Sequence, residues 1–372
     1  KAANTFFYGC CSGGCTLTGI GTNYPDNAVG SGVTSKLSVG IVSAYQLYGD
    51  GSNLSGLSGF SPDDQENLVA GTDAGAAKDA DTCFNIMIGC NAGLALCGGY
   101  GHSIFMGCHA GKSVTTGGYN FLFGQRTGCN ITTGQQNIMI GNGPGRTITT
   151  GSCNIFLGKS IAVSGTGEHD NNIVIGHESA YRLDTGDDNI ILGAQAGCDV
   201  SSGNRNIYVG KSAGANSTTG SDNIALGCCA MYSCAVTGNN NVFLGSYSGR
   251  KTESAGCNIA IGYKASEFME TGDFNVAIGA ESGGSTGSGV SGHCNVAIGK
   301  NALQQLTGGT RNVALGFLAG GGGGPGSRNV VIGTCAGWCG VKSDDTIAIG
   351  YFAGCMAADP TNGCGIFIGR YA

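Results

Sequence analysis

Residues 120–158 read NFLFGQRTGCNITTGQQ-NIMIGNGPGRTITTGSC-NIFLG, and this stretch decides the fold. Asparagine, three apolar residues and glycine follow one another from Asn120, Asn137 and Asn154, at a spacing of 17 residues. Followed outward, this five-residue pattern begins eighteen times between Asn67 and Gly365, and its fifth residue is always glycine. Eleven of the seventeen intervals are 17 residues long and four are 18. The chain is therefore an array of one repeated unit.

Each unit has the chemistry of one coil of a β-solenoid. The first residue, here named the anchor, is asparagine in fifteen units, and stacked asparagines predict an amide ladder along the axis. Positions two and four are large and apolar in every unit but the first, so we expect them to point inward from a short strand. Glycine at position five and recurrent Thr-Thr-Gly segments supply the corners. One unit cannot bury its own apolar side and must stack on its neighbours.

The predicted fold is all-β: a single-chain parallel β-solenoid, or β-roll, of about 18 coils over residues 67–372, roughly 85 Å long. Residues 1–66 lack the repeat and are rich in turns, as in residues 48–57. We expect them to form a small N-terminal β module that joins subunits.

Composition excludes several other classes of protein. Glycine accounts for 72 of 372 residues, but proline for only 5, which argues against collagen. Apolar residues make up 41 % of the chain and the net charge is −6, which argues against disorder. The same mild acidity gives no reason to expect a nucleic-acid partner. No apolar stretch approaches the length of about 20 residues that spans a bilayer, so no membrane span is expected.

Position three of the strand is also apolar in every unit, although alternation predicts that it points outward. A row of exposed apolar side chains exceeds what a monomer usually tolerates. We expect this row to be an assembly stripe for lateral contact with identical chains, unless neighbouring loops or a second layer cover it. End-to-end contact is the other predicted mode of self-assembly, with residues 1–66 covering the end of a neighbour. The stripe consists of Met87, Phe105, Leu122, Met139, Phe156, Val174, Ile191, Tyr208 and Phe243.

The chain has 19 cysteines without Cys-x-x-Cys pairs, which favours an oxidising compartment over metal sites. Cys90 and Cys108 share position six of consecutive units and are the first disulfide candidates. Cys339 and Cys355 are the next pair, and Cys10, Cys11 and Cys15 form an N-terminal cluster of the same kind. The alternative is that these are buried free thiols. Glycosylation sequons at Asn53, Asn130 and Asn216 also fit secretion.

The repeated five-residue motifs resemble those of known protein families. Units such as Asn258-Ile-Ala-Ile-Gly and Asn275-Val-Ala-Ile-Gly resemble the repeats of phage tail fibres and microbial surface fibres. They are also similar to the β-roll head repeats of trimeric autotransporter adhesins, and residues 42–57 are similar to a segment of phage fibre proteins. The resemblance covers residues 42–372 and implies a homo-oligomeric fibre, either extracellular or on a virion. The cysteine content departs from typical phage fibres.

Catalysis finds no support, because the five histidines are scattered and none lies in a hydrolase or metalloprotease motif. We therefore expect a structural subunit of an extracellular or virion fibre, not an enzyme, with neither cofactor nor metal. The alternative is an adhesin or receptor-binding fibre shaft that recognises surface glycans. Its aromatic candidates are dispersed: Tyr100, Tyr181, Tyr232, Trp338 and Tyr351.

Overall fold

A computed structural model describes residues 62–98, 101–165, 167–232, 236–284, 289–322, 326–338, 343–355 and 364–372. The chain divides into two units, Lys1–Gly56 and Leu57–Ala372, and every described residue belongs to the second. The predicted N-terminal module therefore lies almost wholly outside the described residues, and its boundary at residue 66 stays a prediction.

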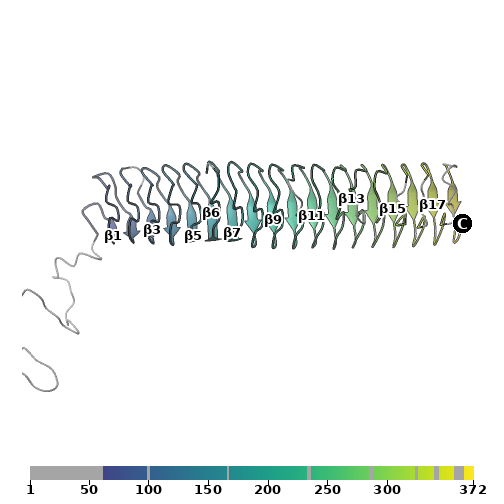
Figure 1. Cartoon of the computed structure of the whole chain (residues 1–372), viewed down its shortest axis with the longest axis horizontal. Helices are drawn as coiled ribbons and strands as arrows, with labels where there is room; N and C mark the ends of the chain where they lie inside the picture. The colour runs from purple at the N-terminus through teal and green to yellow at the C-terminus, as the bar shows by residue number, and fades with distance from the viewer. Residues whose placement is uncertain are drawn as a thin grey trace, which may run out of the picture. The chain divides into compact units, whose positions relative to one another are not determined.

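The described residues form a parallel β-solenoid in which each coil contributes one short strand to a single sheet (Figure 1). The strands are β1 (Leu68–Ala70), β2 (Ile86–Ile88), β3 (Ile104–Met106), β4 (Phe121–Phe123), β5 (Ile138–Asn142), β6 (Ile155–Lys159), β7 (Ile173–His177), β8 (Ile190–Leu192), β9 (Ile207–Val209), β10 (Ile224–Leu226), β11 (Val242–Leu244), β12 (Ile259–Ile261), β13 (Val276–Ile278), β14 (Val296–Ile298), β15 (Val313–Leu315), β16 (Val330–Ile332), β17 (Ile347–Ile349) and β18 (Ile366–Ile368). The predicted all-β solenoid of about 18 coils is confirmed. The described part of the chain holds no helix long and apolar enough to cross a membrane.

Every strand pairs with the next coil at the same position of the repeat. Ile190 lies beside Ile207 where the interval is 17 residues, and Val276 lies beside Val296 where it is 20. Extra residues are therefore absorbed outside the strands. Identical positions form unbroken rows along the sheet.

Two corner positions allow the chain to turn at each end of the strand. The residue before the anchor has a positive φ in every coil, as at Asp222 (60°) and Phe274 (57°). The glycine at position five also has a positive φ, for example 134° at Gly262. A Cβ on Gly262 would lie 2.6 Å from the carbonyl oxygen of Gly279 in the next coil. Only glycine fits where coils approach this closely.

Position three points into the core, so the predicted orientation of the strand is wrong. All nine residues of the predicted assembly stripe are fully buried, including Phe105, Met139 and Phe243 at 0 % exposure. The anchor asparagines are buried as well, as at Asn137. Because strand side chains alternate, a buried position one places position three inside and positions two and four outside. Opposite the strand, a second row of buried side chains that includes Ile131 and Leu183 completes the narrow core.

Candidate assembly surface

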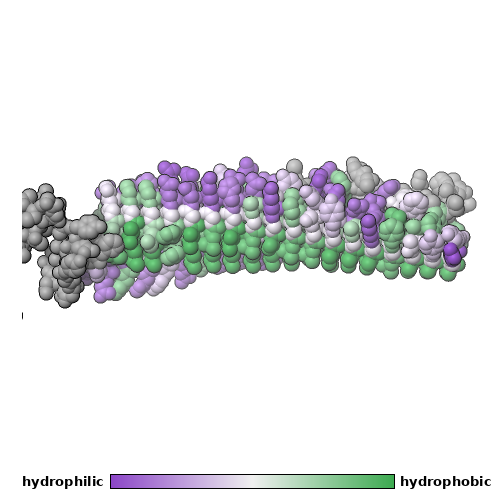
Figure 2. All heavy atoms as spheres, turned by 90° about the horizontal axis from the view of Figure 1, so that it is seen from below, coloured by the Kyte–Doolittle hydropathy of each residue, from purple (hydrophilic) through white to green (hydrophobic). Residues whose placement is uncertain are grey.

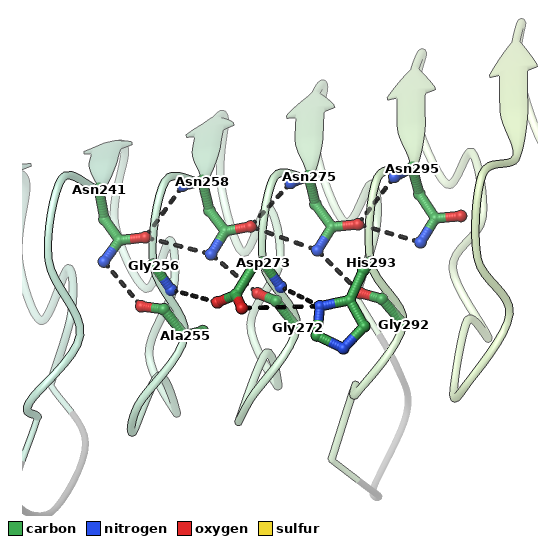
Figure 3. Close-up of polar contacts among 10 residues, drawn as sticks. All are labelled: Asn241, Ala255, Gly256, Asn258, Gly272, Asp273, Asn275, Gly292, His293 and Asn295. Atoms are coloured by element: carbon green, nitrogen blue, oxygen red, sulfur yellow. Dashed lines mark hydrogen bonds and ion pairs between the residues drawn. The ribbon is translucent and has the colours of Figure 1, made fainter.

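A ladder of asparagine side chains holds each coil at a fixed place on the one before it (Figure 3). The backbone N and Nδ2 of Asn258 both donate to Oδ1 of Asn241, each at 3.1 Å. The same Nδ2 also donates to the carbonyl oxygen of the corner residue Gly272 at 2.9 Å. These bonds recur along the rod, and at Ser103 a hydroxyl replaces the amide, where Oγ accepts from the backbone N of Asn120 at 3.1 Å. The predicted amide ladder is present.

A second ladder, which the sequence analysis missed, lies two residues before the anchors. Oδ1 of Asp273 accepts from the backbone N of Gly256 at 2.7 Å, and the backbone N of Asp273 donates to Nδ1 of His293 at 2.9 Å (Figure 3). In this second ladder the backbone N of the earlier coil donates the hydrogen bond, whereas in the asparagine ladder the donors belong to the later coil. Polar side chains recur at this position, as at Asp170 and Asp187, and this was the signal in the sequence. Both ladders fix the coil spacing, and hence the spacing of the rows on the sheet.

Ion pairs join neighbouring coils in the row directly before the anchors. Nε and Nη2 of Arg205 donate to the two carboxylate oxygens of Asp222 at 2.7 and 2.8 Å. This hydrogen bonding lowers the pKa of Asp222. Arg328 binds Asp345 in the same way, at 2.6 and 2.9 Å. Because these groups are exposed, the pairs contribute little stability.

The outer face of the sheet carries two continuous rows of apolar side chains, from positions two and four. Ile138, Ile140 and Ile175 are 41, 37 and 40 % exposed, although each is flanked by apolar neighbours in its own row. No charged or polar residue occupies either position in any coil. Figure 2 shows the result as an unbroken hydrophobic band along the solenoid.

This band is large enough to be an interface. Seventeen steps of about 4.8 Å give a length of roughly 80 Å, and two rows of side chains give a width of about 11 Å. The area is therefore on the order of 900 Å², compared with about 800 Å² per partner in a standard interface. The largest apolar patch of a monomer is usually about 300–600 Å².

The predicted cysteine pairs have mixed outcomes. Cys90 and Cys108 are free thiols in the structure, so the predicted disulfide between them is not formed there. Cys355 forms no disulfide with a described residue, and its predicted partner Cys339 lies outside the described residues, as do Cys10, Cys11 and Cys15. A different thiol lies near Cys355: burial and then the charge of Cys355 raise the pKa of Cys335.

Two of the three predicted sequons lie among the described residues. Asn130 is exposed, whereas Asn216 is half-buried and donates from Nδ2 to the carbonyl oxygen of Tyr232 at 2.9 Å. Asn53 lies outside the described residues. Asn130 is therefore the more accessible of the two described sequons.

A shallow depression of about 620 Å³ lies on the flank of the solenoid, lined by Cys229, Tyr232, Tyr247, Arg250, Lys251, Glu253 and Glu270. The guanidinium carbon of Arg250 lies 5.8 Å from the centre of the Tyr247 ring. Tyr232 is 43 % exposed. Of the predicted aromatic candidates, Tyr232 alone belongs to this depression, and Tyr100 is outside the described residues.

Comparisons with protein-family models and with curated proteins identify no relative of this chain. The chain matches no protein-family model, and no curated protein is similar to it. The function is therefore argued from the geometry of the coils and their outer face.

Proposed function

We propose that this chain is a structural subunit of an extracellular or virion fibre, and that identical chains assemble through the outer face of the sheet. The observation that carries the proposal is the double apolar row of positions two and four, which runs the length of the described coils without a charge. The extracellular or virion setting rests on the resemblance of the repeats to those of fibre proteins.

A second copy suits this face better than other occupants do. Every copy presents the same rows at the same spacing, so the side chains of one face fit between those of another when two faces are opposed. Face-to-face sheets pack about 10 Å apart, which suits side chains of the size of Ile, Leu and Val. Burial of about 900 Å² on each partner would match the about 800 Å² that each partner buries in a standard interface. The end-to-end contact expected from residues 1–66 stays a prediction.

Lysine substitutions on the outer face test this assembly. We expect the triple change Phe123→Lys, Ile140→Lys and Ile190→Lys to convert assembled full-length protein into monomer, because the lysines cannot be desolvated in an apolar interface. All three side chains are at least 36 % exposed in the single chain, so the solenoid itself tolerates the change. Sedimentation measures the mass and electron microscopy shows the particles.

A matched control adds the same charge to the same three coils outside the face. Gln125→Lys, Asn142→Lys and Ala194→Lys occupy position six, where Lys159 and Lys211 occur naturally. We expect this control to assemble as the unaltered chain does. A lone monomer from the unaltered chain at high concentration, or unchanged assembly of the outer-face variant, would rule out the proposal.

The second candidate function is an adhesin shaft that binds surface glycans, and the depression around Tyr232 and Tyr247 favours it. Aromatic rings stack on the apolar faces of sugars, while Arg250 and Glu253 offer hydrogen bonds to hydroxyl groups. We expect a glycan-array signal that Tyr232→Ala abolishes and that Tyr351→Ala, an exposed tyrosine elsewhere, leaves unchanged. Tyr232→Ala should still assemble, which separates binding from fibre formation. Absence of any glycan signal would remove this candidate.

A further inference from the structure

We propose that Cys90, Cys108 and His109 form a binding site for a thiophilic metal ion such as Zn²⁺. The two sulfur atoms and an imidazole nitrogen lie within 4.8 Å of one another. Among the residues that the structure describes, no other group of three histidine, cysteine or acidic ligands is arranged this way. Two thiolates and an imidazole are a preferred donor set for Zn²⁺.

The repeat itself builds the site. Cys90 and Cys108 both follow the position-five glycine of their coils, just after β2 and β3 respectively. The backbone N of His109 donates to the carbonyl oxygen of Cys90 at 2.8 Å, which continues the strand register past the glycines. At His109 the chain turns with a φ of 62°, and the imidazole lies beside the two sulfurs. The ligands therefore sit on a rigid corner.

A metal ion fits the spacing of the coils better than a disulfide does. Side chains that stack in register in a parallel sheet keep the strand separation of about 4.8 Å at Cβ. A disulfide requires a Cβ–Cβ separation of about 3.5–4.5 Å, so it would pull the two coils together. Two sulfurs bound to one Zn²⁺ at about 2.3 Å each lie roughly 3.8 Å apart, which the side chains can reach without moving the backbone.

The site is accessible and has room for another ligand. Cys90 is exposed, and Cys108 and His109 are half-buried, so an ion can enter from solvent. Two thiolates would balance the charge of a divalent ion, with both thiol protons released on binding. Three protein ligands leave the fourth tetrahedral position for water or for a group from another molecule. The bound ion would link the coils of β2 and β3 and so stabilise them.

Metal titration of the reduced full chain tests the proposal, with Co²⁺ as a spectroscopic probe and Zn²⁺ as its competitor. We expect Cys90→Ser, Cys108→Ser and His109→Gln each to lose one equivalent of bound metal and its thiolate-to-cobalt absorption. The controls Cys97→Ser and His102→Gln, exposed residues of the coil that begins at Asn85, should retain both. Zn²⁺ should raise the melting temperature of the unaltered chain more than that of the three site variants.

Two results would overturn the proposal. One is equal metal stoichiometry and affinity in the unaltered chain and in all three site variants. The other is a linked Cys90–Cys108 peptide in digests of protein purified without reductant, because a disulfide would consume both ligands. None of the five side chains is fully buried, so circular dichroism should show that each variant retains the fold.

Discussion

Oδ1 of Asn241 accepts two hydrogen bonds from Asn258, one from its backbone N and one from its Nδ2, each 3.1 Å long. Asn258 in turn accepts two bonds from Asn275. Asn258→Ala would leave the backbone N of Asn275 without its partner inside the solenoid. Since a buried group left unsatisfied costs about 1–3 kcal/mol, we expect a loss of about 3 kcal/mol from the several groups affected.

Urea unfolding measures this loss, and hydrogen exchange at the amide of Asn275 locates it. Asn142→Ala is the matched control, because Asn142 is exposed and its Nδ2 bonds only to the exposed Gln125 side chain at 3.2 Å. We expect the control to change stability by less than about 0.5 kcal/mol. Equal effects of the two substitutions would mean that the ladder does not stabilise the coils.

Neighbouring isoleucines of β8 test which face of the strand is the core. Ile191 is fully buried, whereas Ile190 is 36 % exposed on the outer face. We expect Ile191→Ala to lose about 2–5 kcal/mol, the usual range for a buried isoleucine. Ile190→Ala should lose less than about 1 kcal/mol, because part of its surface stays in water. Denaturant midpoints of the dissociated chain give both values, and a larger loss at Ile190 would contradict the assignment of faces.

The fold class follows from the sequence because the repeat is regular. Glycine at position five and an anchor about every 17 residues leave no room for helices and demand stacking. Strand register follows as well, since aligned anchors align the strands: Asn137 and Asn154 precede β5 and β6, which pair residue for residue.

The direction of the side chains did not follow, because all three middle positions of the strand are apolar. Hydrophobicity alone could not separate Met139, which is inside, from Ile138 and Ile140, which are outside. The anchor supplied the missing signal: if Asn137 stacks in a buried ladder, alternation also places Met139 inside. The expected assembly stripe was placed on position three, whose side chains are buried, whereas the exposed apolar rows come from positions two and four. Whether the actual outer face assembles stays a proposal.

Close approach of coils at the position-five glycines makes these sites intolerant of any side chain. At Gly262, alanine would place its Cβ 2.6 Å from the carbonyl oxygen of Gly279, at a φ of 134°. We expect Gly262→Ala to lose about 3 kcal/mol or more, through strain and a broken coil contact. Gly308→Ala is the control, since the nearest atom to its Cβ would be Oγ of Ser291 at 3.8 Å. Thermal unfolding gives the melting temperatures of the two variants, and equal values would refute the steric argument.

A buried histidine makes one coil sensitive to acid. His169 is fully buried against Phe156, with ring centres 5.7 Å apart, and neither ring nitrogen has a hydrogen-bond partner in the protein. Burial lowers the pKa of His169 from 6.5 to about 4. Between these values the unfolded chain binds a proton that the folded chain does not. Stability is therefore lost as the pH falls from about 6.5 to about 4, by at most about 3 kcal/mol.

His169→Leu should remove this pH dependence, because leucine fills a similar volume and does not titrate. We expect the variant to be at least as stable as the unaltered chain at pH 7 and clearly more stable at pH 4.5. At pH 4.5 the unfolded form of the unaltered chain gains a proton that buried His169 does not bind, and leucine removes this difference. Urea midpoints at the two pH values measure the difference. The exposed His177→Gln serves as the control and should keep the acid sensitivity of the unaltered chain. If His169→Leu and the unaltered chain lose stability equally on acidification, the sensitivity arises elsewhere, and His169 does not titrate as its burial requires.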